Sequence, residues 1–234
     1  MKFCFIFDLD GVLVESLDFE RAVSDLIVQT IGIDRHLSRK EAERLWLSTL
    51  RTHRDHPRWH DYGLHCSALG LTDEWKSFHE QVRQLICPMP SVLESLQSSH
   101  YAGSCWLASD ATQWVVEFKL RAAGINLTEF DEVFTLDRCL ASKGHHEFWE
   151  KVKACVPNEE THLIYIDNRD DRLLTAAEVL PKCSLVKIIA EDHPTSLGLF
   201  FRKGSLTDTR VYQAASSDLP SVLKSITQTI RASE

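Results

Sequence analysis

The 234-residue sequence lacks several features that would place it in a specialised class of protein. It has no long repeat and no low-complexity tract, which argues against a solenoid or a disordered chain. Its seven cysteines form no CxxC pair, so we expect free thiols in a reducing compartment rather than disulfides or zinc ligands. The apolar run at the N-terminus is too short for a signal peptide or a membrane span. These absences predict a cytoplasmic protein with no membrane partner.

An excess of positive charge is also missing. The formal net charge is −8, which repels a nucleic-acid backbone, and we find no basic patch in the sequence to offset it. We therefore expect no nucleic-acid partner. The sequence does contain 44% hydrophobic and 26% charged residues, the composition of an ordinary globular protein. This length suits one large domain or a core with a smaller inserted domain, and the composition leaves the oligomeric state open.

Strand and helix signals alternate along most of the chain, which predicts an α/β fold with a parallel sheet. Residues Phe3 to Phe7 are continuously apolar, as in a strand buried on both faces. Later strands are expected near 105–108, 132–136, 162–167 and 185–190. The helices between them are expected near 112–124, 145–155 and 172–180, and a closing helix near 219–230, opened by Asp218.

Helix signals dominate between residues 17 and 86, with little sign of a strand. Ser38 is a plausible N-cap of one helix there, with Glu41 as its capping-box partner. A breaker cluster, Cys87-Pro88-Met89-Pro90, closes this stretch. We therefore predict a Rossmann-like core formed by residues 1–16 and 88–234, with an all-helical cap of residues 17–87 inserted in it.

Two carboxylates, Asp8 and Asp10, follow the predicted first strand. In an extended segment their side chains share one face, and Gly11 then lets the chain turn. Ligands of open α/β sheets bind beyond the carboxyl ends of the strands. A divalent cation there would neutralise the pair and allow one carboxylate to act as a nucleophile; magnesium suits the all-oxygen ligands. The alternative is a solvated strand end followed by a turn.

Further polar residues follow apolar runs later in the chain: Ser109 after CWLA, Lys143 ahead of HHEFW, and Asp167 with Asp171 after HLIYI. Each has a simpler interpretation, because Ser109 and Asp110 would also cap a helix, Lys143 would also suit the surface, and 167–171 would also suit an acidic loop. Taken together, however, these segments resemble the four motifs of the haloacid dehalogenase superfamily, in order and across the chain. The matching segments are FDLDGVL at 7–13, LASDA at 107–111, Lys143, and IDNRDD at 166–171.

This resemblance implies catalytic roles for four residues. Asp8 would be the nucleophile that forms an aspartyl-phosphate, and Asp10 the general acid and later the general base. Ser109 would hydrogen-bond the transferred phosphoryl group. Lys143 would hold the nucleophile and the phosphate oxygens. Members of the superfamily that displace halide lack the second carboxylate, so Asp10 disfavours dehalogenation.

The same resemblance implies a magnesium site formed by Asp8, the backbone carbonyl of Asp10, and Asp167. Asp171 would bind the ion through water or support a ligand, and its choice over Asp170 rests on the four-residue spacing. Two departures from the pattern stand out. Gly144 follows Lys143 where the family often has proline, and Ile166-Asp167-Asn168 stands where many members have Gly-Asp or Asp-Asp.

The helical insertion resembles the superfamily's common cap, which closes over the site and favours small substrates. Its segment 56–71 is loosely similar to the pyrimidine 5'-nucleotidase branch. In that case Tyr62 or Trp59 would stack on a base, and a sugar or second phosphate would contact a residue among Arg54, His60 and His65. Packing or surface positions are the alternative for each of these residues. Zinc at His56 and His60 is disfavoured because Pro57 interrupts a helix between them.

We therefore predict a magnesium-dependent phosphatase acting on small phosphomonoesters, with nucleoside monophosphates as leading candidates. A phosphomutase-type phosphotransferase, a protein phosphatase and a catalytically silent binding protein are the rivals. The phosphotransferase would keep the same motifs, and the protein phosphatase would need a cap that leaves the site open. A silent binder would have no physical need for five polar groups at one crevice.

Overall fold

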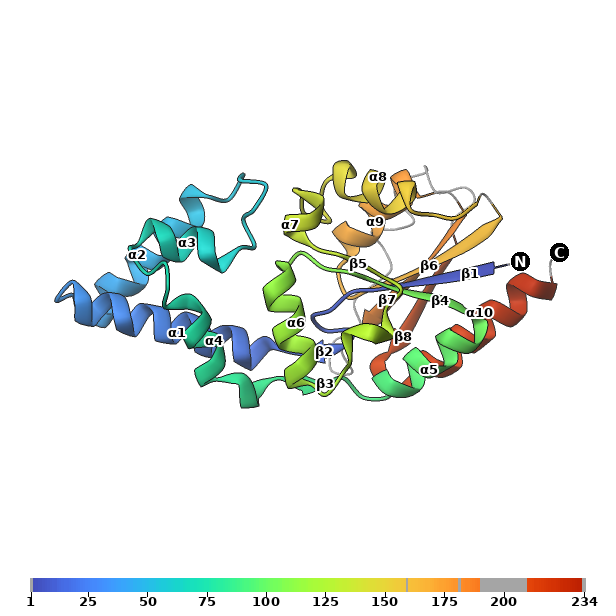
Figure 1. Ribbon diagram of the computed structural model, residues 1–234, viewed down its shortest axis with the longest axis horizontal. Helices are drawn as coiled ribbons and strands as arrows, with labels where there is room; N and C mark the ends of the chain where they lie inside the picture. Colours follow the sequence, from blue (N-terminus) through green and yellow to red (C-terminus); the bar gives the residue numbers. More distant parts are fainter. Residues whose placement is uncertain (1, 159, 181, 190–209, 233–234) are drawn as a thin grey trace.

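The computed structural model describes residues 2–158, 160–180, 182–189 and 210–232, and it has an α/β architecture (Figure 1). A parallel sheet of six strands lies in the order β5-β4-β1-β6-β7-β8. Its strands are β1 (Lys2–Phe7), β4 (Gly103–Ala108), β5 (Glu132–Phe134), β6 (Thr161–Asp167), β7 (Cys183–Ile189) and β8 (Val211–Ala215). The predicted α/β class with a Rossmann-like parallel sheet is confirmed.

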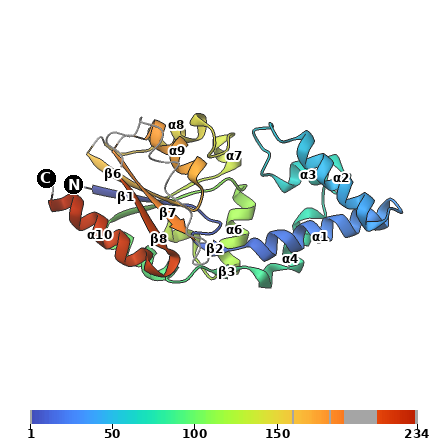
Figure 2. The ribbon, with the colours of Figure 1, turned by 180° about the vertical axis from the view of Figure 1, so that it is seen from behind.

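The central strand β1 is buried on both faces. Phe3, Phe5 and Phe7 pack into one hydrophobic cluster, whereas Cys4 and Ile6 pack into another, because successive side chains of a strand point to opposite faces. Helices cover the two sides (Figures 1 and 2). One cluster includes α5 (Val92–Ala102), α6 (Gln113–Ala122) and α10 (Leu219–Ala232), and the other α7 (Leu136–Cys139), α8 (His146–Ala154) and α9 (Asp170–Val179).

Residues 17–86 contain helices and no strand, and they extend from one end of the sheet region (Figure 1). The predicted capping box is present, since the Ser38 N–H donates to Glu41 Oε2 over 2.9 Å. A short antiparallel pair of strands, β2 (Val14–Glu15) and β3 (Cys87–Pro88), lies where this segment joins the sheet region. The division into a core and a cap at 17–87 stays our interpretation. The helices are α1 (Leu17–Asp34), α2 (Arg39–Thr52), α3 (Tyr62–Ala68), α4 (Trp75–Gln81) and the 3-10 helix η1 (Arg83–Leu85), and a second 3-10 helix, η2 (Leu127–Glu129), follows α6.

Three details of the predicted elements were wrong. The strand expected at 132–136 ends at Phe134, because Thr135 caps α7 with its hydroxyl. The strand near 185–190 is β7, with Ala190 outside the described residues, and it is followed by β8 rather than being the last strand. The pair β2–β3 was missed because two residues show no periodicity.

Two further expectations concern the cysteines and the membrane. All seven cysteines are free, as predicted, and Cys87 and Cys155 are exposed. None of the helices in the described part of the chain has the length and apolar character needed to span a bilayer.

Candidate active site

Three predicted site residues meet at the carboxyl edge of the sheet. Phe7 of β1 pairs with Leu107 of β4 and with Ile166 of β6. Because the strands run parallel, Asp8 and Asp167, which follow these pairs, and Ser109, two residues after Leu107, lie at the ends of three adjacent strands. All three are buried, with Asp8 only 6% exposed.

Lys143 lies between the two carboxylates. Its Nζ is 2.5 Å from Asp8 Oδ1 and 2.8 Å from Asp167 Oδ2, and the residue is 2% exposed. Its backbone is held from both sides, since its N–H donates to Asp110 Oδ1 over 2.5 Å and its carbonyl accepts from Trp149 Nε1 over 2.7 Å. The alternative of a solvated surface lysine is therefore wrong.

The electrostatics of this buried cluster leave it short of positive charge. Burial and the nearby Asp167 raise the pKa of Asp8 to about 8, against the opposing effect of Lys143. Burial alone would lower the pKa of Lys143, but Asp167, Asp8 and Asp110 raise it above its ordinary value. One ammonium thus serves two buried carboxylates, and Asp8 Oδ2 accepts no hydrogen bond from the described residues. Oxygen donors with unbalanced negative charge fit a hard divalent cation such as magnesium.

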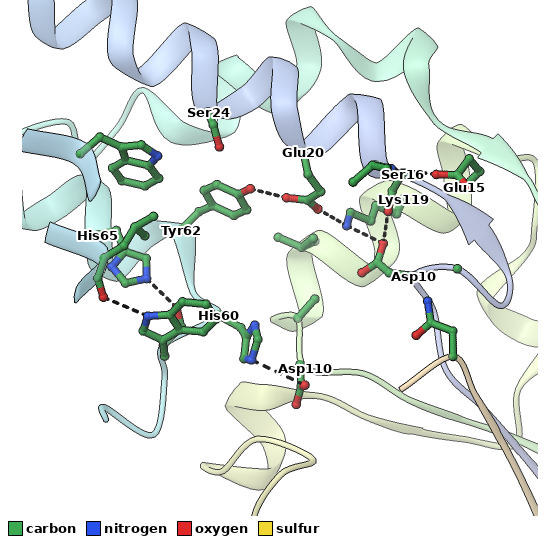
Figure 3. A pocket seen from close by; sticks show the side chains of 18 residues that line it. Asp10, Glu15, Ser16, Glu20, Ser24, His60, Tyr62, His65, Asp110 and Lys119 are labelled. Atoms are coloured by element: carbon green, nitrogen blue, oxygen red, sulfur yellow. Dashed lines mark hydrogen bonds and ion pairs between the residues drawn. The ribbon is translucent and has the colours of Figure 1, made fainter. Parts of the chain in front are cut away.

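Asp10 takes part in a hydrogen-bond network with residues of the helical segment and of α6 (Figure 3). Its Oδ1 accepts hydrogen bonds from Ser16 Oγ and from Lys119 Nζ, the latter over 2.7 Å. Lys119 also donates to Glu20, which accepts a second hydrogen bond from the hydroxyl of Tyr62. Burial alone would lower the pKa of Lys119, but Asp10 and Glu20 raise it above its usual range. Sequence reasoning missed both Lys119 and Glu20.

Asp171 does not join this buried group, and its predicted role near a metal ion stays a prediction. Its carboxylate accepts from Arg169 Nε and Nη2 over 3.1 and 2.9 Å, and its side chain is 57% exposed. The alternative acid, Asp170, pairs with Lys187 Nζ at 3.0 Å. Asp170 and Asp171 therefore each pair with a neighbouring cation. Asp167 is the acid of this segment that contacts Lys143 in the buried cluster.

The loop after β4 carries a second polar group. Helix α6 begins after Thr112, so Ser109 and Asp110 do not cap it. Ser109 Oγ instead accepts from the Ala111 N–H over 3.1 Å. Asp110 Oδ2 is 2.9 Å from Arg172 Nη2 and 3.6 Å from His60 Nε2, so it joins residues from α9 and from the helical segment. Burial opposes ionisation of Asp110, but Lys143, His60 and Arg172 hold its pKa below the usual range.

A cavity of about 550 Å³ lies between the helical segment and the sheet edge (Figure 3). Tyr62, Trp59, His60 and His65 line it, whereas Arg54 is not among its lining residues. Glu15 lies at the cavity as well, on strand β2. Asp8 is not among the lining residues, but Asp10, which follows the same strand, and Asp110, which follows β4, are.

The histidines of the helical segment do not form a metal site. His60 faces Asp110, whereas His56 Nδ1 accepts from the Arg58 N–H over 3.0 Å. No group of three or more histidine, cysteine or acidic side chains in the described part of the chain is arranged to hold a metal ion. The magnesium site implied by the resemblance uses two carboxylates and a backbone carbonyl, so this finding bears on zinc and not on magnesium.

Solved structures share this fold over nearly the whole chain. A haloacid dehalogenase (HAD) superfamily phosphatase from Thermococcus onnurineus matches with a TM-score of 0.72 and 18% identity, covering 95% of this chain and 98% of that one. A provisionally assigned HAD hydrolase from Bacillus subtilis, bound to magnesium, matches with a TM-score of 0.62 and 11% identity over 95% and 98% of the two chains. The L-2-haloacid dehalogenase of Xanthobacter autotrophicus matches with a TM-score of 0.58 and 13% identity, covering 96% of this chain and 99% of that one.

The sequence itself matches no protein-family model and no curated protein. The structural matches nonetheless identify the class of architecture: this chain has the haloacid dehalogenase fold, with a parallel sheet, a helical insertion after the first strand, and acids at the strand ends.

Proposed function

We propose that this protein is a magnesium-dependent phosphohydrolase that cleaves small phosphomonoesters through an aspartyl-phosphate on Asp8. The observation that carries the proposal is the buried cluster of Asp8, Lys143 and Asp167, with Ser109 at the end of the next strand and a cavity lined by the neighbouring Asp10 and Asp110. A cluster that needs added positive charge, at the ligand-binding edge of an open sheet, suits a phosphate group and its metal ion.

Each step has a residue to carry it. Asp8 attacks phosphorus, the bond to the ester oxygen breaks, and Asp10 gives a proton to the leaving oxygen; Asp10 then takes a proton from the water that attacks the phosphoaspartate. Lys143 and Ser109 bind the phosphoryl oxygens and offset the charge that develops on them. Magnesium held by Asp8, the Asp10 carbonyl and Asp167 would supply further positive charge there.

Two features favour phosphoester hydrolysis over the alternatives. An oxygen leaving group needs a proton, which a halide does not, and Asp10 lines the cavity where that oxygen would lie. The cavity is also bounded by residues of the helical segment, including Trp59 and Tyr62, which favours a small molecule over a phosphorylated protein side chain. Hydrolysis rather than transfer to a second hydroxyl remains part of the proposal.

The experiment is phosphate release from a generic aryl phosphate, with and without magnesium, by the native protein and Asp8→Asn. We expect magnesium-dependent turnover that falls by about a thousandfold or more in Asp8→Asn, because the nucleophile is lost. The matched control is Asp25→Asn, which changes a surface carboxylate on α1 that pairs with Arg39. This variant should keep native activity. Equal turnover by Asp8→Asn and the native protein would contradict the proposal.

A further inference from the structure

The cavity above the site is rich in negative charge. One lysine, Lys119, lines it. Four carboxylates also line it: Asp10, Glu15, Glu20 and Asp110. These acids come from the strand-end loops, from β2 and from α1, so their convergence is a property of the folded molecule (Figure 3).

The cations near the cavity are already engaged. Lys119 serves two acids, since its Nζ is 2.7 Å from Asp10 Oδ1 and also donates to Glu20. Arg172 is paired with Asp110 at 2.9 Å. Glu15 forms no ion pair within the described residues; its Oε1 accepts only the Leu17 N–H, over 2.9 Å. The lining therefore carries an excess of carboxylate over ammonium.

The histidines of the lining do not restore the balance at neutral pH. Burial lowers the pKa of His60, and the nearby Arg172, Arg169 and Lys143 act in the same direction, against Asp110. Burial also lowers the pKa of His65, whose Nε2 contacts the carbonyl oxygen of Trp59. Both rings are therefore neutral near pH 7, and a second anionic group on a substrate would meet no free cation among the lining residues.

Aromatic rings form much of the remaining wall. Trp46, Trp59 and Tyr62 line the same cavity, and the Tyr62 hydroxyl donates to Glu20 (Figure 3). An ammonium group is attracted to the negative face of an aromatic ring, and more strongly where water is excluded. Carboxylates and aromatic rings around one space are the chemistry of a site for an organic cation.

We propose that this cavity receives a positively charged alcohol part, so that the substrates are monophosphates of amino alcohols. The inference rests on the proposed function and extends it. Lys143 pairs with Asp8 at the strand ends, whereas Glu15 and Glu20 line the cavity from β2 and α1, so the site suits a molecule with a negative phosphate at one end and an ammonium at the other. A phosphate ester with a second anionic group would be repelled from the same space.

The test measures binding to magnesium-loaded Asp8→Asn by calorimetry at neutral pH, which avoids differences in leaving-group reactivity. The ligands are aminoalkyl phosphates of two, three and four carbons, the hydroxyalkyl phosphates of equal length, and the matching carboxyalkyl phosphates. We expect the best aminoalkyl phosphate to bind about tenfold or more tightly than its hydroxyl counterpart, and the carboxylates most weakly. Equal or reversed affinities would overturn the inference, as would tighter binding of a nucleoside monophosphate or a sugar phosphate.

Two substitutions in the Asp8→Asn background locate the effect. Glu20→Gln and Glu15→Gln should each reduce the preference for the amine over the hydroxyl severalfold, and Glu15 tests the idea without disturbing Lys119. Glu117→Gln, an exposed acid on the same helix as Lys119, should leave the preference unchanged. An unchanged preference in both Glu15→Gln and Glu20→Gln would overturn the inference. Turnover of the aryl phosphate by the native protein separates this failure from failure of the proposed function.

Discussion

Gly144 makes room for a buried arginine beside the active site. A Cβ atom at this position would lie 1.9 Å from Arg172 Nη1. Arg172 in turn pairs with Asp110, whose other oxygen accepts the backbone N–H of Lys143. The glycine that stands where the related family often has proline therefore has a local physical reason, and Arg172 acts through Asp110 to position the lysine.

Gly144→Ala should reduce the free energy of unfolding by about 1–3 kcal/mol, because the guanidinium of Arg172 must move out of a packed, ion-paired position. Urea unfolding measures this loss. In Gly144→Ala/Arg172→Met the added methyl group meets no guanidinium, so the double variant should be more stable than the sum of the single losses predicts. Strict additivity of the two losses would contradict the proposed contact.

Most of the motif residues were predictable because they follow a strand signal, whereas Lys143 and the buried partners of these residues were harder to find. Asp8 and Asp167 lie at the end of buried apolar runs, and Lys143 was found only through the family resemblance. Lys119 and Arg172 were missed, although both sit at buried helical positions, four residues from the buried Val115 and Ala176. A basic residue at a position of a helix where the periodicity predicts an apolar one thus indicates a buried ion pair. The sequence does not indicate which acid is its partner.

At the scale of elements, aromatic rings join α1 and α4 to α6. Trp75 and His79 of α4 contact Trp114 of α6 at 4.9 and 5.6 Å between ring centroids, and Phe19 of α1 contacts Phe118 at 5.9 Å. His79 is fully buried, with Nδ1 2.7 Å from the Trp75 carbonyl oxygen and Nε2 without a hydrogen-bond partner in the described chain. Trp75 thus belongs to this interface, whereas Trp46 is buried within the helical segment.

This interface should make stability depend on pH through His79. Burial lowers its pKa from 6.5 to about 4, although the Trp75 carbonyl and Glu20 oppose the shift and Lys119 adds to it. The folded state then binds fewer protons than the unfolded state between these values, so stability is lost as the pH falls from about 6.5 toward 4, by up to about 3 kcal/mol. Above pH 7 the residue contributes no pH dependence.

Chemical unfolding of the native protein and His79→Phe at pH 7 and pH 4.5 checks this expectation. The free energy of unfolding should fall by about 2 kcal/mol less between pH 7 and pH 4.5 in His79→Phe than in the native protein. The pKa of His162 is also lowered to about 4, and this residue contributes the same pH dependence of stability in both proteins. The exposed His56→Gln is the control and should follow the native protein. Identical losses in His79→Phe and the native protein would show that His79 does not titrate in this range.

The larger elements were predicted because hydrophobic periodicity is local, whereas the smallest were not. Strands β1, β4 and β6 have apolar runs, and helix α2 has its capping box written in Ser38 and Glu41. Strand β8 has a polar residue, Gln213, at its centre and, within the described residues, lies at the edge of the sheet beside β7, so its pairing and not its own sequence defines it. Tertiary pairing overrides weak local preference at such edges.

At the scale of the whole molecule, the cavity depends on contacts between segments far apart in the chain. Lys119 and Glu20 are 99 residues apart, and Arg172 and His60 are 112 apart. Such pairs leave no periodic trace in the sequence, so the contacts that join the helical segment to the strand ends were not predicted, although the resemblance implied a cap over the site. The charge excess of the cavity likewise became visible only when acids from several elements were brought together.

Lys119→Met tests how far one buried cation holds the helical segment against the sheet region. The substitution leaves Asp10 and Glu20 facing each other without their shared partner. We expect a loss of about 2–3 kcal/mol in the free energy of unfolding, less than for a fully buried pair because both carboxylates retain some contact with water. Repulsion between the two acids should also loosen the helical segment, seen as a larger radius of gyration in small-angle X-ray scattering. Adding Glu20→Gln to Lys119→Met should relieve the repulsion and restore the compact shape. The control is Lys40→Met, at an exposed position, which should change neither the stability nor the radius of gyration.

A Lys119→Met protein with native stability and an unchanged scattering profile would show that packing of the aromatic rings, and not this ion pair, holds the two parts together.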